Sequence, residues 1–164
     1  NLKCDRPALT VIEFPDASSV NSTVDPSGNF RTMSCNVTAG AVVTDEQNRV
    51  LLLQHRFRPG FQQGGGWGIP GGFLQSGEQP EEAIRRELRE EISLEVDVPK
   101  VAFVRALGKY NQIEIIFRCH PRGVFQLQSR EISRAEWFAL DSLPQTLSDD
   151  QRALINQATS CEHL

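Results

Sequence analysis

The segment PEEAIRRELREEI at residues 80–92 constrains the fold most strongly. Pro80 suits the first position of a helix, and Glu81 and Glu82 interact favourably with the helix dipole in the first turn. Strong helix formers follow to the end of the segment. Aliphatic residues recur along one side, at Ile84, Leu88 and Ile92. The pattern therefore predicts an amphipathic helix that buries this side in a core.

Three carboxylates of this helix lie beside its apolar stripe. At about 100° per residue, Glu90 and Glu91 fall within about 60° of Glu87, at the border of the buried face. Like charges three and four residues apart destabilise a helix, and partial burial raises that cost. Arg86 cannot neutralise all three, whereas Mg²⁺ or Mn²⁺ suits such oxygen ligands. The alternative is a solvated acidic face laced with ion pairs.

The rest of the chain predicts a mixed α/β domain. Residues rich in β-branched side chains predict strands at 37–44, 50–54, 100–107, 112–119 and 131–140. The polar turn at 45–48 indicates that the first two form a hairpin. A second helix begins at Ser148, whose spacing to Gln151 is that of a capping box, and runs to about residue 158. Strands that pair locally around two helices predict a mixed sheet with helices packed on it.

The domain boundary is expected near residue 35. Residues 1–34 are weakly patterned, and we expect a loop-rich extension with one candidate strand, followed by a single domain at 35–164. Residues 58–77 contain most of the glycines, together with Pro59 and Pro70. This composition predicts a long connection in which bare backbone can approach a ligand closely.

Composition disfavours several classes of function. The chain is 39% hydrophobic and 23% charged, which is typical of a globular domain. A net charge of −4 disfavours generic binding to nucleic acid or to an anionic membrane. No apolar run is long enough to span a membrane and no secretory signal is evident, so we expect a cytoplasmic protein. The spacing of the four cysteines and three histidines matches neither a zinc site nor a disulfide framework.

The predicted helix and the turn before it resemble the Nudix box. Its pattern is G-x5-E-x7-R-E-U-x-E-E-x-G-U, in which U is a bulky aliphatic residue. Gly72, Glu78 and residues 86–94 match every specified position except one, because Ser93 stands where the pattern has glycine. A chance match has a frequency on the order of one in a million chains or lower. Similarity to Nudix sequences extends over about residues 36–145.

The resemblance implies a fold, a cofactor and roles for individual residues. The fold would be an α/β/α sandwich with a mixed β-sheet, and the cofactor Mg²⁺ or Mn²⁺. Carried over position by position, the metal ligands would be Glu87, Glu91, Glu90 and the backbone carbonyl of Gly71. The catalytic residues would be Arg86, which orients the glutamates, and Glu90 or Glu131 as the general base. Gly72 and Glu78 would be structural positions. Ser93 would replace a left-handed glycine at a cost of ~1 kcal/mol, without touching the metal.

The resemblance also implies the substrate class. The family hydrolyses small-molecule nucleotides, namely a nucleoside diphosphate linked to another moiety such as ADP-ribose, a dinucleoside polyphosphate or a nucleotide sugar. Four residues are candidates for substrate contact: Arg56, Arg58, Trp67 and Tyr110. The arginines would bind phosphate and the aromatic rings would stack on a base, the alternatives being surface charge and ordinary packing.

Other functions and assemblies stay open at this point. A nucleoside triphosphate pyrophosphohydrolase and a catalytically inactive nucleotide-binding regulatory module are the alternatives to the proposed activity. The three intact glutamates favour an active enzyme over the regulatory module. A homodimer is also open, with residues 1–34 as a pairing segment.

Overall fold

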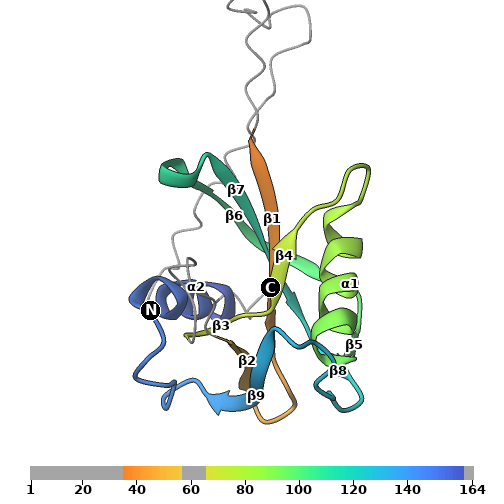
Figure 1. Ribbon diagram of the computed structural model, residues 1–164. Helices are drawn as coiled ribbons and strands as arrows, with labels where there is room; N and C mark the ends of the chain where they lie inside the picture. Colours follow the sequence, from red (N-terminus) through yellow and green to blue (C-terminus); the bar gives the residue numbers. More distant parts are fainter. Residues whose placement is uncertain (1–34, 57–65, 161–164) are drawn as a thin grey trace, which may run out of the picture. The chain divides into compact units, whose positions relative to one another are not determined.

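The computed structural model describes residues 35–56 and 66–160 (Figure 1). The expected extension at 1–34 and the candidate Arg58 lie outside the described residues. In chain order the elements are β1 (Asn36–Val43), β2 (Arg49–His55), β3 (Trp67–Gly68), β4 (Gly71–Phe73), α1 (Pro80–Ile92), β5 (Glu95–Val96), β6 (Lys100–Leu107), the 3-10 turn η2 (Gly108–Tyr110), β7 (Gln112–Cys119), β8 (Pro121–Arg122), β9 (Ile132–Ala139) and α2 (Asp149–Thr159). No described helix is long and apolar enough to cross a membrane.

The strands form three sheets. One has the order β4-β1-β7-β6, another has the order β3-β2-β9, and β5 pairs with β8. In the four-stranded sheet β1 runs parallel to β7, while β4 and β6 run antiparallel to their neighbours. The sheet is therefore mixed, and the predicted α/β class is confirmed.

The predicted hairpin between β1 and β2 is wrong. These strands belong to different sheets, and only one bridge joins them in the described chain, between Thr44 and Val50. The turn itself forms as its polar residues indicate, because Asp45 Oδ1 accepts the Arg49 amide at 2.8 Å. Local turn chemistry reverses the chain, but the partner of β1 is decided by the core, where β1 aligns with β7 along its whole length.

Two apolar clusters lie on opposite faces of the strands, one under each helix (Figure 1). On one face α1 buries Ala83, Ile84, Leu88 and Ile92. On the other face α2 buries Leu154, Ile155 and Ala158. Strand β1 serves both clusters because its side chains alternate, with Ala41 in the first and Val42 in the second. Each fully buried aliphatic side chain contributes roughly 1.5–3 kcal/mol, so this layering holds α1 against the sheet.

The helices begin and end at or next to the residues predicted from the sequence, with one difference in the capping of α2. Helix α1 ends at Ser93, which adopts left-handed angles of φ 51° and ψ 31° and donates its amide to Arg89 at 3.0 Å. At α2, Ser148 Oγ accepts the Gln151 amide at 3.2 Å, as expected of an N-cap. The Gln151 side chain does not close the predicted box. Its Oε1 accepts the Ile69 amide at 3.0 Å and so ties α2 to the segment between β3 and β4.

The glycine-rich connection contains two short strands that the sequence pattern did not predict. Strand β3 pairs with β2, and β4 pairs with β1 through Gly71 opposite Gly40 and Gly72 opposite Ala39. Two- and three-residue strands carry too little alternation to be recognised in sequence. Their pairing brings the glycine turn beneath α1.

Candidate metal centre and active site

Bare backbone at Gly71 and Gly72 allows β4 to lie closely between β1 and α1. A Cβ atom on Gly71 would stand 2.3 Å from the carbonyl oxygen of Ala39. A Cβ atom on Gly72 would stand 2.2 Å from Oε1 of Glu87. Backbone atoms of β1 leave no room for a side chain at Gly71, and the absence of one at Gly72 lets the Glu87 carboxylate lie directly on the backbone of the turn.

Glu91 is the buried acid of the site. The residue is 9% exposed, and its Oε2 has no hydrogen-bond partner in the described part of the chain. Burial raises the pKa of Glu91 to about 8, and the negative charges of Glu87 and Glu131 add to that effect. A hydrogen bond with the Gly71 backbone acts in the opposite direction. An orphaned carboxylate oxygen among other acids is a favourable ligand for a hard divalent cation.

Arg86 organises the remaining acids. Its Nε donates to Glu78 Oε1 at 2.8 Å, and its Nη1 donates to Glu87 Oε1 at 2.7 Å. The same Nη1 lies 3.3 Å from Glu90 Oε2, and Nη2 donates to the Phe73 carbonyl at 3.1 Å. The hydrogen bond that Arg86 donates to Glu78 is the largest cause of the raised pKa of Arg86. One guanidinium therefore fixes three glutamates relative to the turn after β4.

The loop before β9 closes over the C-terminal end of α1. The amides of Gln128 and Ser129 both donate to the Glu91 carbonyl, at 3.1 and 3.2 Å. The next residues bring Glu131 close enough for its charge to raise the pKa of Glu91. The Arg56 amide donates to the Glu131 carbonyl at 2.7 Å, which joins the end of β2 to this loop.

His55 is a neighbour of the site that its sequence position did not reveal. Burial lowers the pKa of this half-buried histidine, and the charge of Glu131 opposes that shift. No histidine in the sequence has a spacing typical of a ligand. The proximity of His55 and Glu131 could not be predicted, because it arises only when β2 pairs with β9. A bulge at His55 marks the end of that pairing.

The acids differ in how they face solvent. The Glu87 side chain is 17% exposed, whereas that of Glu90 is 60% exposed. Within residues 35–56 and 66–160, no three histidine, cysteine, aspartate or glutamate side chains are arranged to hold a metal ion. A site with three carboxylate ligands would therefore need Glu87 or Glu90 to turn away from Arg86. The donor chemistry nevertheless fits a divalent cation, since Glu91 presents an unpartnered oxygen beside Glu87.

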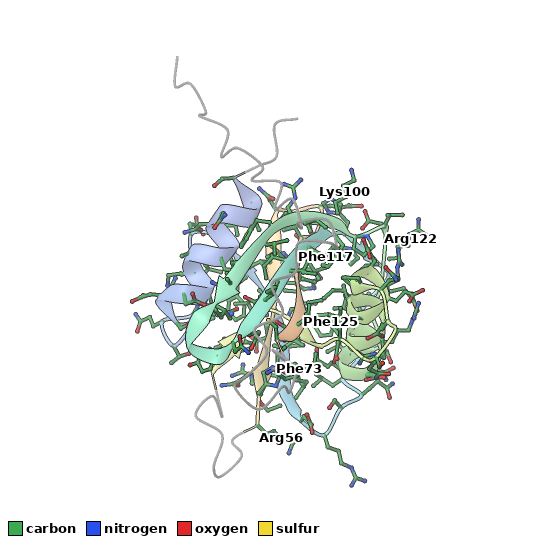
Figure 2. The ribbon with its side chains drawn as sticks, turned by 90° about the horizontal axis from the view of Figure 1, so that it is seen from above. Arg56, Phe73, Lys100, Phe117, Arg122 and Phe125 are labelled. Atoms are coloured by element: carbon green, nitrogen blue, oxygen red, sulfur yellow. The ribbon has the colours of Figure 1, made fainter. Side chains whose placement is uncertain are left out.

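The candidate substrate residues do not form one group. Arg56 is exposed at the end of β2 (Figure 2). Trp67 packs edge-to-face on Phe138 with ring centroids 5.0 Å apart, and the Arg134 guanidinium lies 5.6 Å from its ring. Tyr110 is exposed in η2. That turn lies near the start of β1, about 13 Å along the strand from the glycine pair at about 3.3 Å per residue.

This chain has a mixed sheet between two helices and an acidic helix against a Gly-Gly turn, and this combination is that of a Nudix domain. The model of the NUDIX domain family matches residues 36–158. The chain therefore belongs to the Nudix family, and it is a pyrophosphohydrolase of that family.

Individual relatives agree with this assignment. The chain is 27% identical over 113 residues to a MutT-like protein of Streptomyces ambofaciens, covering 69% of this chain and 70% of the relative. It is 31% identical over 121 residues to an ADP-ribose pyrophosphatase of Methanocaldococcus jannaschii, covering 68% and 67%. The structure of a MutT NUDIX hydrolase from Burkholderia pseudomallei superposes with a TM-score of 0.66 at 27% identity, covering 76% of this chain and 98% of that one.

Proposed function

We propose that this enzyme hydrolyses the phosphoanhydride bond of a nucleoside diphosphate linked to another moiety, with Mg²⁺ or Mn²⁺ as cofactor. The observation that carries the proposal is the buried Glu91 carboxylate, with an Oε2 that has no partner among the described residues and with three acids close by. Such a group is costly in an ionised state unless a cation binds it. The similarity to an ADP-ribose pyrophosphatase supports ADP-ribose as one member of the substrate class.

Four groups would hold the cation: the carboxylates of Glu87, Glu91 and Glu90 and the backbone carbonyl of Gly71. When bound, a divalent ion supplies charge neutralisation to the diphosphate and lowers the pKa of the attacking water. Arg86 would keep Glu78 and the turn after β4 in place through its hydrogen bonds to Glu78 and the Phe73 carbonyl, while Glu87 or Glu90 turns from the guanidinium toward the cation. Arg56, exposed beside the Glu131 loop, would contact a phosphate oxygen of the substrate.

Of the two candidates for the general base, Glu131 has the better surroundings. The Glu90 carboxylate is already engaged by the Arg86 guanidinium, 3.3 Å away. Glu131 lies between the buried Glu91 and the half-buried His55. We therefore assign Glu131 the role of accepting the proton of the attacking water.

A substrate screen tests the proposal. The purified protein is incubated with Mg²⁺ and ADP-ribose, dinucleoside polyphosphates, NADH, nucleotide sugars or nucleoside triphosphates, and the released phosphates are quantified. We expect hydrolysis of a linked nucleoside diphosphate, and loss of at least about 100-fold in Glu87→Gln and Glu91→Gln. Glu81→Gln, at an exposed position of the same helix, is the matched control and should retain activity.

Two results would contradict the proposal. Full activity of Glu91→Gln would contradict the assignment of Glu91 as a metal ligand. Hydrolysis confined to nucleoside triphosphates would instead support a triphosphate pyrophosphohydrolase.

A further inference from the structure

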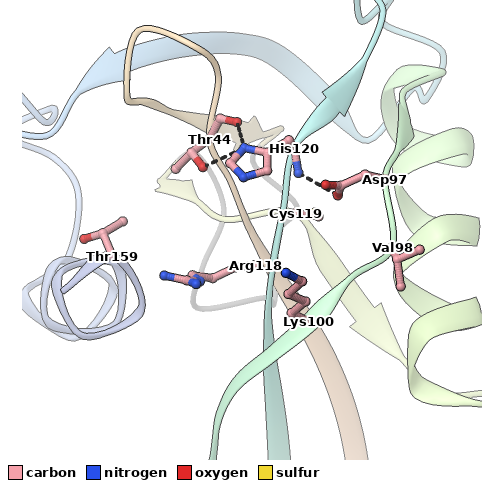
Figure 3. Close-up of a pocket in the computed structure, with 8 residues that line it drawn as sticks. All are labelled: Thr44, Asp97, Val98, Lys100, Arg118, Cys119, His120 and Thr159. Carbon is pink, nitrogen blue, oxygen red and sulfur yellow. Dashed lines mark hydrogen bonds between the residues drawn. The ribbon is translucent and has the colours of Figure 1, made fainter. Parts of the chain in front are cut away.

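A small polar pocket lies at the C-terminal end of β7, between α2 and the segment after β5 (Figure 3). Its volume is about 70 Å³, and its walls include Lys100, Arg118 and His120. Figure 3 shows Arg118 reaching toward α2 and Asp97 on the side of α1. The pocket is therefore built mainly from cationic and hydrogen-bonding side chains.

Two cationic side chains, Lys100 and Arg118, line this pocket, and neither has a carboxylate partner among residues 35–56 and 66–160. Lys100 of β6 is the register partner of Arg118 on the antiparallel strand β7. Like charges at directly opposite positions of a sheet are destabilising. Neither side chain forms an ion pair within the described ranges, and the one protein acceptor that Arg118 finds there is the Ala158 carbonyl, at 3.3 Å. Within the described residues, no protein acceptor meets the remaining N–H groups of Lys100 and Arg118.

The nearby polar groups do not cancel this positive charge. His120 Nδ1 lies 2.9 Å from the Thr44 carbonyl oxygen, so this nitrogen carries the hydrogen and donates it. Nε2 is the nitrogen left for other contacts. Asp97 is the one carboxylate among the lining residues, and its Oδ1 accepts the His120 amide at 2.8 Å. Two formal positive charges thus face one negative charge.

We propose that this pocket binds a phosphate group, either free inorganic phosphate or the phosphate of a monoester. Ammonium and guanidinium donors form charge-assisted hydrogen bonds to phosphate oxygens. The small volume suits a single tetrahedral oxyanion. An open groove that shares Thr44 and His120 with the pocket, and is also lined by Trp137, provides room for the organic part of a monoester.

This site is separate from the candidate metal centre. Arg118 pairs in register with Val42, which belongs to the cluster under α2, and its guanidinium contacts the end of that helix. Glu87 and Glu91 lie on the α1 face of the same sheet. Phosphate binding here therefore needs no metal ion and does not involve the box glutamates.

Binding can be tested on the full chain in EDTA. Inorganic phosphate, AMP or adenosine is titrated against ¹⁵N-labelled protein, and the amide shifts of Asp97, Val98, Lys100 and residues 118–120 are followed. We expect saturable shifts with phosphate and AMP and none there with adenosine. Tighter binding of AMP than of phosphate would place the monoester in the groove, whereas equal affinities would assign the site to the phosphate alone.

Charge variants provide the decisive comparison. Lys100→Glu should weaken phosphate binding by about 10-fold or more, since it replaces a charge-assisted donor by a like charge. Arg122→Glu is the matched control, because Arg122 is exposed as Lys100 is and lies outside the pocket (Figure 2). Arg122→Glu and Glu91→Gln should bind phosphate like the wild type. Hydrolytic activity should persist in Lys100→Glu, which shows that the variant is folded.

Three outcomes would overturn the proposal. One is the absence of saturable shifts in the wild type. Another is equal weakening by Lys100→Glu and Arg122→Glu, which would indicate general charge screening. The third is loss of the shifts in Glu91→Gln, which would assign the binding to the metal centre.

Discussion

The Glu87 carboxylate lies against the backbone of Gly72. A Cβ atom at position 72 would stand 2.2 Å from Oε1 and 2.5 Å from Cδ of Glu87. Real Cβ atoms essentially never approach other heavy atoms closer than 3.0 Å. A side chain at position 72 would therefore have to displace the Glu87 carboxylate, which occupies the space that a Cβ atom would need.

Replacing Gly72 by alanine should displace that carboxylate. We expect Gly72→Ala to lower kcat/KM by about 100-fold, since displacing a catalytic group by about 1 Å has effects of this size. Steady-state kinetics measure the change in kcat/KM, and thermal unfolding measures separately any change in stability. Gly66→Ala is the control, because no atom lies within 4 Å of a Cβ atom at that position. Equal activity in both variants would show that the position of Glu87 is unimportant.

Arg86→Lys should impair the enzyme although it preserves the charge. A lysine ammonium cannot bridge Glu78, Glu87 and the Phe73 carbonyl at once, as the guanidinium does. We expect kcat/KM to fall by about 10-fold or more, because hydrogen bonds to charged groups contribute roughly 1.5–3 kcal/mol. Arg89→Lys, in an exposed ion pair of the same helix, should remain near wild type. A similar loss in both variants would argue against a positioning role for Arg86.

The metal-free protein should become less stable as the pH rises. The folded-state pKa of Glu91 is about 8, against an ordinary value of 4.5, so the folded protein holds a proton that the unfolded chain releases in this window. Stability is therefore lost progressively from about pH 4.5 to about pH 8. Urea unfolding in EDTA at several pH values measures this slope.

Glu91→Gln isolates the contribution of this carboxylate. The variant should have a flatter stability profile, and its advantage over the wild type should grow with pH, because the amide cannot ionise. Mg²⁺ should stabilise the wild type more at high pH than at low pH, since cation and proton compete for one carboxylate. Parallel profiles for the two proteins would contradict the assignment.

Ser93→Gly should stabilise the protein. Ser93 occupies the left-handed region at φ 51°, where glycine avoids a steric cost of about 1 kcal/mol. We expect the free energy of unfolding to rise by about that amount while kcat/KM stays unchanged, because Ser93 follows the box acids without contacting them. Denaturant unfolding of Ser93→Gly and Ser93→Ala, the latter without the expected gain, checks this point. No gain in the glycine variant would mean that the strain is relieved elsewhere.

Elements with strong local signals were predictable from sequence. Helix α1 begins and ends where Pro80 and Ser93 indicate, and the strands at residues 100–107 and 112–119 have the predicted bounds. The box pattern was equally readable, because its acids follow a fixed helical spacing. These features depend on interactions between residues that are close in sequence.

The prediction of a hairpin between β1 and β2 was wrong because strand pairing depends on residues that are distant in sequence. The turn after Thr44 is correct in its local chemistry, yet β1 pairs with β7, far along the chain. The two-residue strand at Trp67 carries no detectable period. Partner choice depends on which apolar surfaces pack together, and turn residues do not encode that choice.

By itself, the sequence determined which residues are acidic, which of them share a helix face, and where that helix stops. The tertiary structure decided how deeply Glu91 is buried, that Arg86 joins Glu78 to Glu87, and that Glu131 lies near both Glu91 and His55. The physical reason is that helical spacing is set by neighbouring residues. Burial and charge proximity, in contrast, arise only when separate segments are packed into one core.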